Sequence, residues 1–168
     1  MMSGFLVEEA IKFLVAHFPK ERIKKPSLFH SLRVASYLYL QGYSEEICIA
    51  WLLHDSIEDT PITKDMIEEK FGIHVATIVE VNSKNMSLPK EKILEDIVQR
   101  CANYGEDAMI VKIVEVYDNF LFYTRQVKEW EELQSEIERC KFLANLVLRY
   151  KKKEWENSAF KLATTIDS

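Results

Sequence analysis

The sequence predicts an all-α fold in a single domain, and three observations lead to this prediction. The 168 residues include only 4 Gly and 4 Pro, so few positions favour tight turns. Apolar residues recur at intervals of three and four over most of the chain, which is the spacing of one helix face. Hydrophobic residues make up 48% and charged residues 29%, a balance typical of a globular chain that buries one core.

Local start and stop signals divide this periodicity into separate helices. Pro19 ends the first helix, and Gly42 suits the position after the second. Ser44 and Thr63 are good N-caps for the third and fourth, and Pro89 suits the first turn of a later one. We expect helices over residues 5–18, 28–40, 45–55, 64–72, 73–81, 90–103, 106–127 and 129–152. Residues 155–168 form either a frayed tail or a short docking helix.

Charge and cysteine content argue against several classes of protein. The net charge of −5 and the pI near 5.5 give no general attraction for nucleic acid, because polyanion binders usually carry a basic excess. The sequence has no run of about 18 apolar residues and no signal-peptide pattern, so we expect no membrane partner. Cys48, Cys101 and Cys140 lie in apolar helical patterns, which predicts reduced core thiols in a cytoplasmic protein. The oligomeric state stays open.

Four titratable residues gather at the end of the most apolar predicted helix, residues 45–55. They are His54, Asp55, Glu58 and Asp59. Because burying unpaired charge is costly, such a cluster needs a bound cation or another partner. If the helix continues for one more turn, Glu58 shares a face with His54, and Asp59 with Asp55. The alternative is a solvated acidic helix end without a metal.

Two further residues are candidate metal ligands. His30 lies early in the predicted helix 28–40, and antiparallel packing of that helix against residues 45–55 would bring it close to His54. Glu115 interrupts an otherwise apolar face of the helix 106–127, so we expect a fourth ligand there. Asp118 is the competing candidate, because it lies three residues on and close to the same face.

Two segments resemble the HD superfamily. The first is HSLRVA from His30, and the second is AWLLHDSIEDT from Ala50 to Thr60, in which HDxxEDT is much more specific than HD alone. The resemblance is strongest to the hydrolase domain of RelA/SpoT-type enzymes, which remove the 3′-pyrophosphate of (p)ppGpp, and covers residues 22–125. It implies one helical HD domain over residues 1–168, acting as a stand-alone hydrolase without a synthetase domain.

The resemblance also implies a role for each candidate residue. His30, His54 and Asp55 would bind a divalent metal, with Mn²⁺ the best candidate and Fe²⁺ or Zn²⁺ the alternatives, since a His and carboxylate donor set suits these ions. Glu58 and Asp59 would position and activate the attacking water. A small nucleotide substrate would be bound by Lys24, Lys25, Ser83, Lys84 and Asn119.

The sequence departs from the family pattern at three places. The family has an Asp-Arg pair where this chain has Glu115 and Val116, so the carboxylate is one methylene longer and the arginine is absent. The family also has His where this chain has Asp118, and Lys24 and Lys25 correspond only loosely to an Arg-Lys pair. Two other functions therefore stay open. One is another HD nucleotide phosphohydrolase, and the other is a degenerate HD domain that binds a nucleotide or a partner without turnover.

Overall fold

The computed structural model describes residues 4–18, 27–125 and 130–167, and every regular element within these ranges is helical. The all-α prediction is confirmed. The chain folds as two compact units, Met1–Ser83 and Lys84–Ser168, which are taken here in turn. None of the described helices combines the length and the apolar character needed to cross a bilayer.

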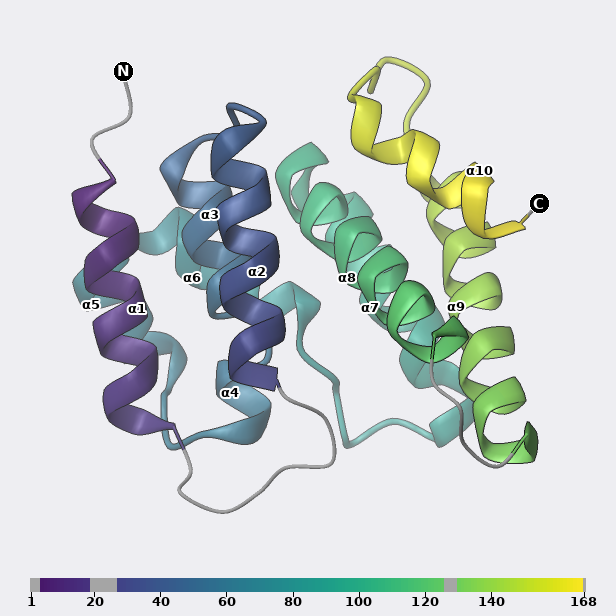
Figure 1. The fold of residues 1–168 in the computed structure, drawn as a ribbon, viewed down its shortest axis with the longest axis horizontal. Helices are drawn as coiled ribbons and strands as arrows, with labels where there is room; N and C mark the ends of the chain where they lie inside the picture. The colour runs from purple at the N-terminus through teal and green to yellow at the C-terminus, as the bar shows by residue number, and fades with distance from the viewer. Residues whose placement is uncertain (1–3, 19–26, 126–129, 168) are drawn as a thin grey trace. The chain divides into compact units, whose positions relative to one another are not determined.

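The first unit is built around one short helix that is buried except for its first two residues. Every residue of α3 from Ile47 to Leu52 is buried, and α3 packs against α1, α2 and α6 (Figure 1). A helix that is apolar on all sides needs neighbours on all sides, so its central place follows from its sequence. The helices of this unit are α1 (Phe5–His17), α2 (Ser27–Leu40), α3 (Glu45–Leu52), α4 (Ser56–Asp59), α5 (Lys64–Phe71) and α6 (Ile73–Asn82).

The predicted N-caps Ser44 and Thr63 are confirmed, but the predicted ends of the helices 45–55 and 106–127 are wrong, since the latter ends at Thr124. The side chains of Ser44 and Thr63 each accept a hydrogen bond from a backbone N–H three residues on, at 3.3 Å. The expected helix 45–55 ends at Leu52, and a turn separates it from α4. The turn is closed by backbone bonds to the third residue back, from His54 N to the Trp51 carbonyl at 3.2 Å and from Ser56 N to the Leu53 carbonyl at 2.8 Å. This tighter pattern ends the α-helix.

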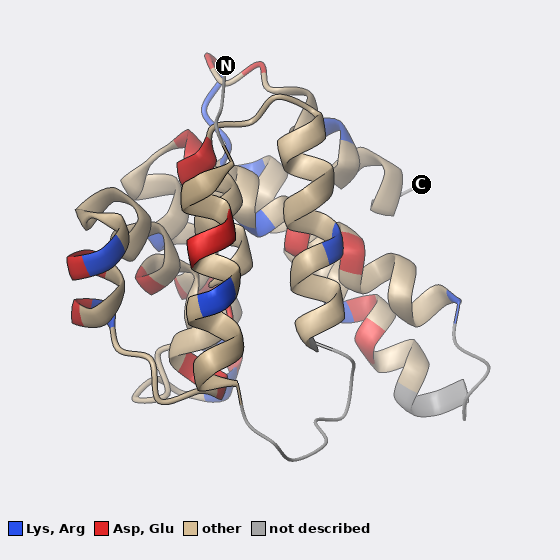
Figure 2. Cartoon of the chain, turned by 60° about the vertical axis from the view of Figure 1, so that its left-hand side comes forward, with Lys and Arg blue, Asp and Glu red and all other residues tan. Residues whose placement is uncertain are grey.

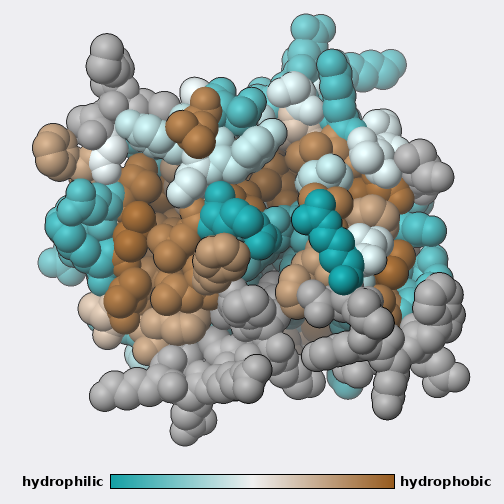
Figure 3. Space-filling view, viewed as in Figure 1, coloured by the Kyte–Doolittle hydropathy of each residue, from teal (hydrophilic) through white to brown (hydrophobic). Residues whose placement is uncertain are grey.

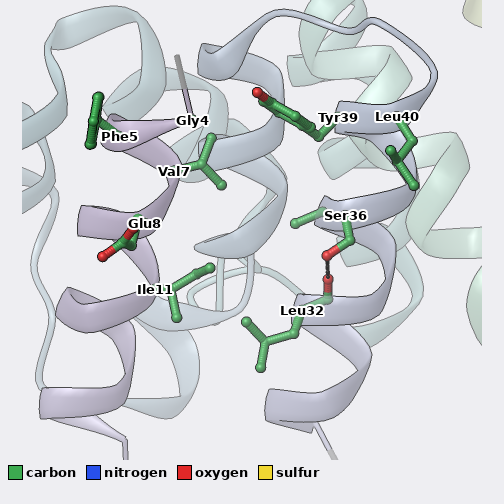
Figure 4. Close-up of a pocket in the computed structure, with 10 residues that line it drawn as sticks. Gly4, Phe5, Val7, Glu8, Ile11, Leu32, Ser36, Tyr39 and Leu40 are labelled. Carbon is green, nitrogen blue, oxygen red and sulfur yellow. Dashed lines mark hydrogen bonds between the residues drawn. The ribbon is translucent and has the colours of Figure 1, made fainter. Parts of the chain in front are cut away.

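An apolar groove of about 520 Å³ lies between α1 and α2 (Figure 4). Figure 3 shows hydrophobic side chains gathered over this part of the first unit. None of the residues that line the groove is a candidate ligand or catalytic residue. The lining residues are Gly4, Phe5, Val7, Glu8, Ile11, Leu32, Ala35, Ser36, Tyr39 and Leu40.

The second unit is built around the long helix α8. All of its residues from Ala108 to Val114 are buried, and α8 packs against α7 and α9. The C-terminal segment that the sequence left open forms a docking helix, because Trp155, Phe160 and Ile166 are buried and α10 packs against α8 and α9. The elements of this unit are α7 (Lys90–Tyr104), α8 (Glu106–Thr124), α9 (Trp130–Tyr150), the 3₁₀-helix η1 (Ser158–Phe160) and α10 (Lys161–Asp167).

Acidic and basic residues are interspersed on the face seen in Figure 2. In the first unit Lys12 pairs with Glu8 at 2.8 Å, and Lys64 of α5 pairs with Glu80 of α6, also at 2.8 Å. Exposed pairs of this kind contribute little to stability.

The three cysteines allow a direct test of the core. Cys48, Cys101 and Cys140 are buried free thiols, and burial raises the pKa of Cys101 to about 12 and that of Cys48 to about 11. A thiol reagent at pH 8 should therefore modify none of them in the native protein, since the thiolate is the reactive form. In guanidinium chloride all three should react. One full equivalent of fast reaction in the native protein would contradict this packing.

Candidate metal centre

Two histidines from separate helices meet in the first unit. His30 lies in the first turn of α2, and His54 lies in the turn after α3, with ring centroids 5.6 Å apart. Asp55 is the next residue in the sequence after His54. Within the described ranges, His30, His54 and Asp55 form the one group of at least three His, Cys, Asp or Glu residues whose donor atoms all lie within 4.8 Å of one another. The predicted proximity of the two histidines is confirmed.

Trp51 holds both rings in place. Its indole stacks on His54 with centroids 4.6 Å apart and meets His30 at 5.4 Å in an edge contact. The indole Nε1 donates a hydrogen bond to the Ser31 carbonyl at 3.2 Å, which ties α3 to α2 beside His30. In the sequence, Trp51 is distinguished only by its place in the most apolar predicted helix. Its position three residues before His54 was the available signal.

The orientation of His54 follows from a hydrogen bond to the backbone. Its Nδ1 lies 2.7 Å from the Trp51 carbonyl, which can only accept, so Nδ1 carries the proton in the neutral ring. The lone pair is then on Nε2, which lies 3.1 Å from the Asp55 carboxylate. A lone pair and a carboxylate oxygen repel each other unless a proton or a metal ion lies between them. The arrangement is that of a histidine metal ligand oriented by a backbone carbonyl.

The spacing of the cluster fits a transition metal ion. Bonds of about 2.0–2.2 Å from nitrogen and oxygen place two ligands of one ion no more than roughly 4.4 Å apart. The donor atoms of this cluster all lie within 4.8 Å of one another, so modest side-chain movements would bring them to one ion. Two imidazoles and one carboxylate suit Mn²⁺, Fe²⁺ or Zn²⁺, and three protein ligands leave positions open for water or a substrate oxygen.

Glu58 and Asp59 lie one turn after the cluster, on α4. The Asp55 carbonyl accepts backbone hydrogen bonds from Glu58 N at 3.1 Å and from Asp59 N at 2.9 Å. Both side chains are exposed, whereas Asp55 is partly buried and His54 is buried. They therefore belong to a separate short helix, so the helix of His54 does not continue for the further turn that would place Glu58 on its face. Asp59 remains one turn from Asp55, to which its backbone N–H donates.

The predicted substrate-binding residues have different positions. Ser83 is buried at the end of α6, and its hydroxyl donates to the Val79 carbonyl at 2.9 Å. Lys84 is exposed at the start of the second unit. Lys24 and Lys25 lie outside the described residues.

In the second unit, Glu115 is held by two neighbours on α8. Lys112 is only 4% exposed, and its Nζ donates to Glu115 Oε2. Asn119 Nδ2 donates to Glu115 Oε1 at 3.4 Å. The spacing of Lys112 and Glu115 allowed an ion pair, but the sequence did not indicate that the lysine is buried. Whether Glu115 or Asp118 binds the metal remains a prediction.

The fold and this cluster are those of a known class of helical protein. A family model described as "HD domain" matches residues 10–109. The chain therefore belongs to the HD-domain family.

Within that family the chain is similar to several named enzymes. It is 30% identical to human guanosine-3′,5′-bis(diphosphate) 3′-pyrophosphohydrolase MESH1, over 74% of this chain and 73% of that protein. The Xenopus tropicalis MESH1 is 31% identical, over 76% of this chain and 75% of that protein. The rice "Putative GTP diphosphokinase RSH1, chloroplastic" is 34% identical, but the chain spans only 11% of its length. It likewise spans 14% of the Aquifex aeolicus pyrophosphohydrolase.

Solved structures agree on the fold. A structure described as "A metazoan ortholog of SpoT hydrolyzes ppGpp and plays a role in starvation responses" matches 99% of this chain and 96% of its own, with a TM-score of 0.78 and 18% identity. A second, of lmo0812 from Listeria monocytogenes, matches 82% of this chain with a TM-score of 0.63 and 24% identity.

Replacing Trp51 with Phe should loosen the cluster without removing a candidate ligand. The change removes the hydrogen bond from the indole to the Ser31 carbonyl, which costs about 0.5–1.5 kcal/mol of unfolding free energy. Mn²⁺ affinity, measured by calorimetry, should also fall because both histidine rings lose their support. Trp155→Phe in the second unit is the matched control and should leave Mn²⁺ affinity unchanged. Equal affinities in wild type and Trp51→Phe would remove Trp51 from the site.

Proposed function

We propose that this chain is a metal-dependent hydrolase that removes the 3′-pyrophosphate from guanosine 3′,5′-bis(diphosphate). The observation that carries the proposal is the cluster of His30, His54 and Asp55, with Glu58 and Asp59 one turn on, in a member of the HD-domain family. The names of the MESH1 relatives give the substrate.

The residues of the cluster would hold Mn²⁺, with Fe²⁺ or Zn²⁺ as alternatives, and Glu115 would complete the site. A bound ion of this kind lowers the pKa of its water from 15.7 towards about 7 and offsets negative charge on phosphate. The structure supports His54 as a ligand most directly, because the Trp51 carbonyl fixes its tautomer.

Glu58 and Asp59 would handle the proton of the attacking water. The water oxygen bonds to the phosphorus attached to the 3′ oxygen, and the bond between that phosphorus and the 3′ oxygen breaks. Pyrophosphate leaves, and the 3′ oxygen takes up a proton to become a hydroxyl. The exposed carboxylates on α4 are suited to this task, because a general base needs access to water and to the proton that it accepts.

The nucleotide itself would be bound by Lys24, Lys25, Ser83, Lys84 and Asn119. The Ser83 hydroxyl donates a hydrogen bond to the Val79 carbonyl, and its oxygen can accept a hydrogen bond from a donor on the nucleotide. The buried thiols fit a reducing compartment, and we propose the cytoplasm.

A second function is favoured by two features of α8. Buried Lys112 neutralises the Glu115 carboxylate, and Val116 is buried and carries no charge. Both features suit a degenerate HD domain that binds a nucleotide without turnover. An HD phosphohydrolase acting on a different nucleotide is the other alternative, and it would show turnover with that substrate.

The test is release of pyrophosphate from guanosine 3′,5′-bis(diphosphate) by the Mn²⁺-loaded protein. His54→Ala and Asp55→Ala should lose Mn²⁺ binding and turnover together, with helical content retained by circular dichroism. Glu58→Gln and Asp59→Gln should keep Mn²⁺ and lower kcat by about 10²–10⁴-fold, the contribution of a positioned acid–base group. Glu69→Gln on α5 is the control for loss of an exposed carboxylate. Full turnover in both α4 variants would exclude the proposed role of α4, and nucleotide binding without turnover in wild type would favour the binding module.

Metal content distinguishes Glu115 from Asp118 as the fourth ligand. Glu115→Gln keeps an acceptor for Lys112 but removes the charge, so Mn²⁺ affinity should fall while the fold persists. Glu115→Asp should retain the metal, since it restores the residue of the family pattern. Asp118→Ala should have no effect on metal content, measured by atomic emission after dialysis. Loss of metal in Asp118→Ala, with retention in Glu115→Gln, would reverse the assignment.

A further inference from the structure

The first turns of α2 carry an exposed aromatic ring and a guanidinium beside the metal cluster. Phe29 directly precedes His30, and its side chain is 62% exposed, whereas His30 is 5% exposed. The guanidinium carbon of Arg33 lies 5.7 Å from the centre of the Phe29 ring. This is the geometry of a cation–π contact, which holds the guanidinium over the ring.

This contact places the positive charge near the candidate ligand. Arg33 lies three residues after His30, so the two side chains are neighbours on the helix surface. Side chains on a helix lean towards its N-terminus, and the contact with Phe29 is consistent with Arg33 reaching back over the turn that carries His30. Arg33 is also the one Lys or Arg of α2.

The charge of the substrate makes such a cation necessary. A pyrophosphate group carries several negative charges, and one divalent ion cannot offset all of them. Val116, where the family pattern has arginine, is an apolar residue 1% exposed.

We infer that Arg33, held by the ring of Phe29, binds a phosphate group of the nucleotide next to the metal cluster. A guanidinium suits this task, because its planar donors match two phosphate oxygens at once. The positive end of the α2 dipole adds to the attraction for an anion at this turn. The inference rests on the proposed function, since it assigns a substrate-binding residue to that same site.

The experiment compares Arg33→Gln with wild type, both loaded with Mn²⁺. KM for guanosine 3′,5′-bis(diphosphate) should rise by about tenfold or more, the loss expected for a charge-assisted hydrogen bond. In the same variant kcat should change little, and Mn²⁺ affinity should not change. The inhibition constant of inorganic pyrophosphate should rise in parallel with KM. Lys12→Gln removes one exposed positive charge on α1 and should leave all four values unchanged.

The ring is tested separately from the charge. Phe29→Leu keeps apolar bulk but removes the cation–π contact, so KM should rise by roughly threefold. Phe29→Tyr keeps an aromatic ring and should leave KM at the wild-type value. In an active wild type, an unchanged pyrophosphate inhibition constant in Arg33→Gln would overturn the inference and leave the proposed function intact. If wild type shows no turnover, the proposed function fails, and equilibrium binding of inorganic pyrophosphate to the two Mn²⁺-loaded proteins still decides the role of Arg33.

Discussion

The hydrogen bond from the Trp51 indole to the Ser31 carbonyl is the contact on which the candidate metal centre depends. It joins α3 to α2 at the level of His30, and the same indole stacks on His54. The Trp51 carbonyl fixes the remaining freedom of His54 by accepting its Nδ1 proton. One fully buried residue therefore sets the positions of two rings from separate helices. Close packing makes such an arrangement rigid before any ligand is bound.

Exposure then rises along the chain in the order that the proposed chemistry requires. His54 is 2% exposed, the Asp55 side chain is 28% exposed, and Glu58 and Asp59 are exposed. A metal ligand benefits from burial, because electrostatic attraction is stronger where water is excluded. A group that accepts a proton from water needs the opposite environment. The tight turn between α3 and α4 produces this change within six residues, since it ends a buried helix and begins an exposed one.

The features that could be predicted from the sequence are mostly those determined by interactions between residues close together in the chain. The N-caps Ser44 and Thr63 and the all-helical fold follow from local chemistry. The closeness of His30 and His54 follows from antiparallel packing of two amphipathic helices. The end of α3 at Leu52 could not be predicted, because the turn depends on contacts of the His54 ring and backbone with Trp51. Docking of α10 depends on tertiary burial of Trp155 and Phe160, which no local pattern reveals.

The departures from the family pattern concern charge more than ligand geometry, and there is a physical reason for that difference. Metal–ligand distances tolerate deviations of only about 0.2 Å, so the proposed ligands His30, His54 and Asp55 have little freedom of position. A cation that offsets phosphate charge acts over several ångströms, and a long side chain from another helix can provide it. We infer that Arg33 on α2 is such a cation, whereas Val116 on α8 carries no charge. A phosphate-binding site can in this way keep its metal chemistry while its cations change helices.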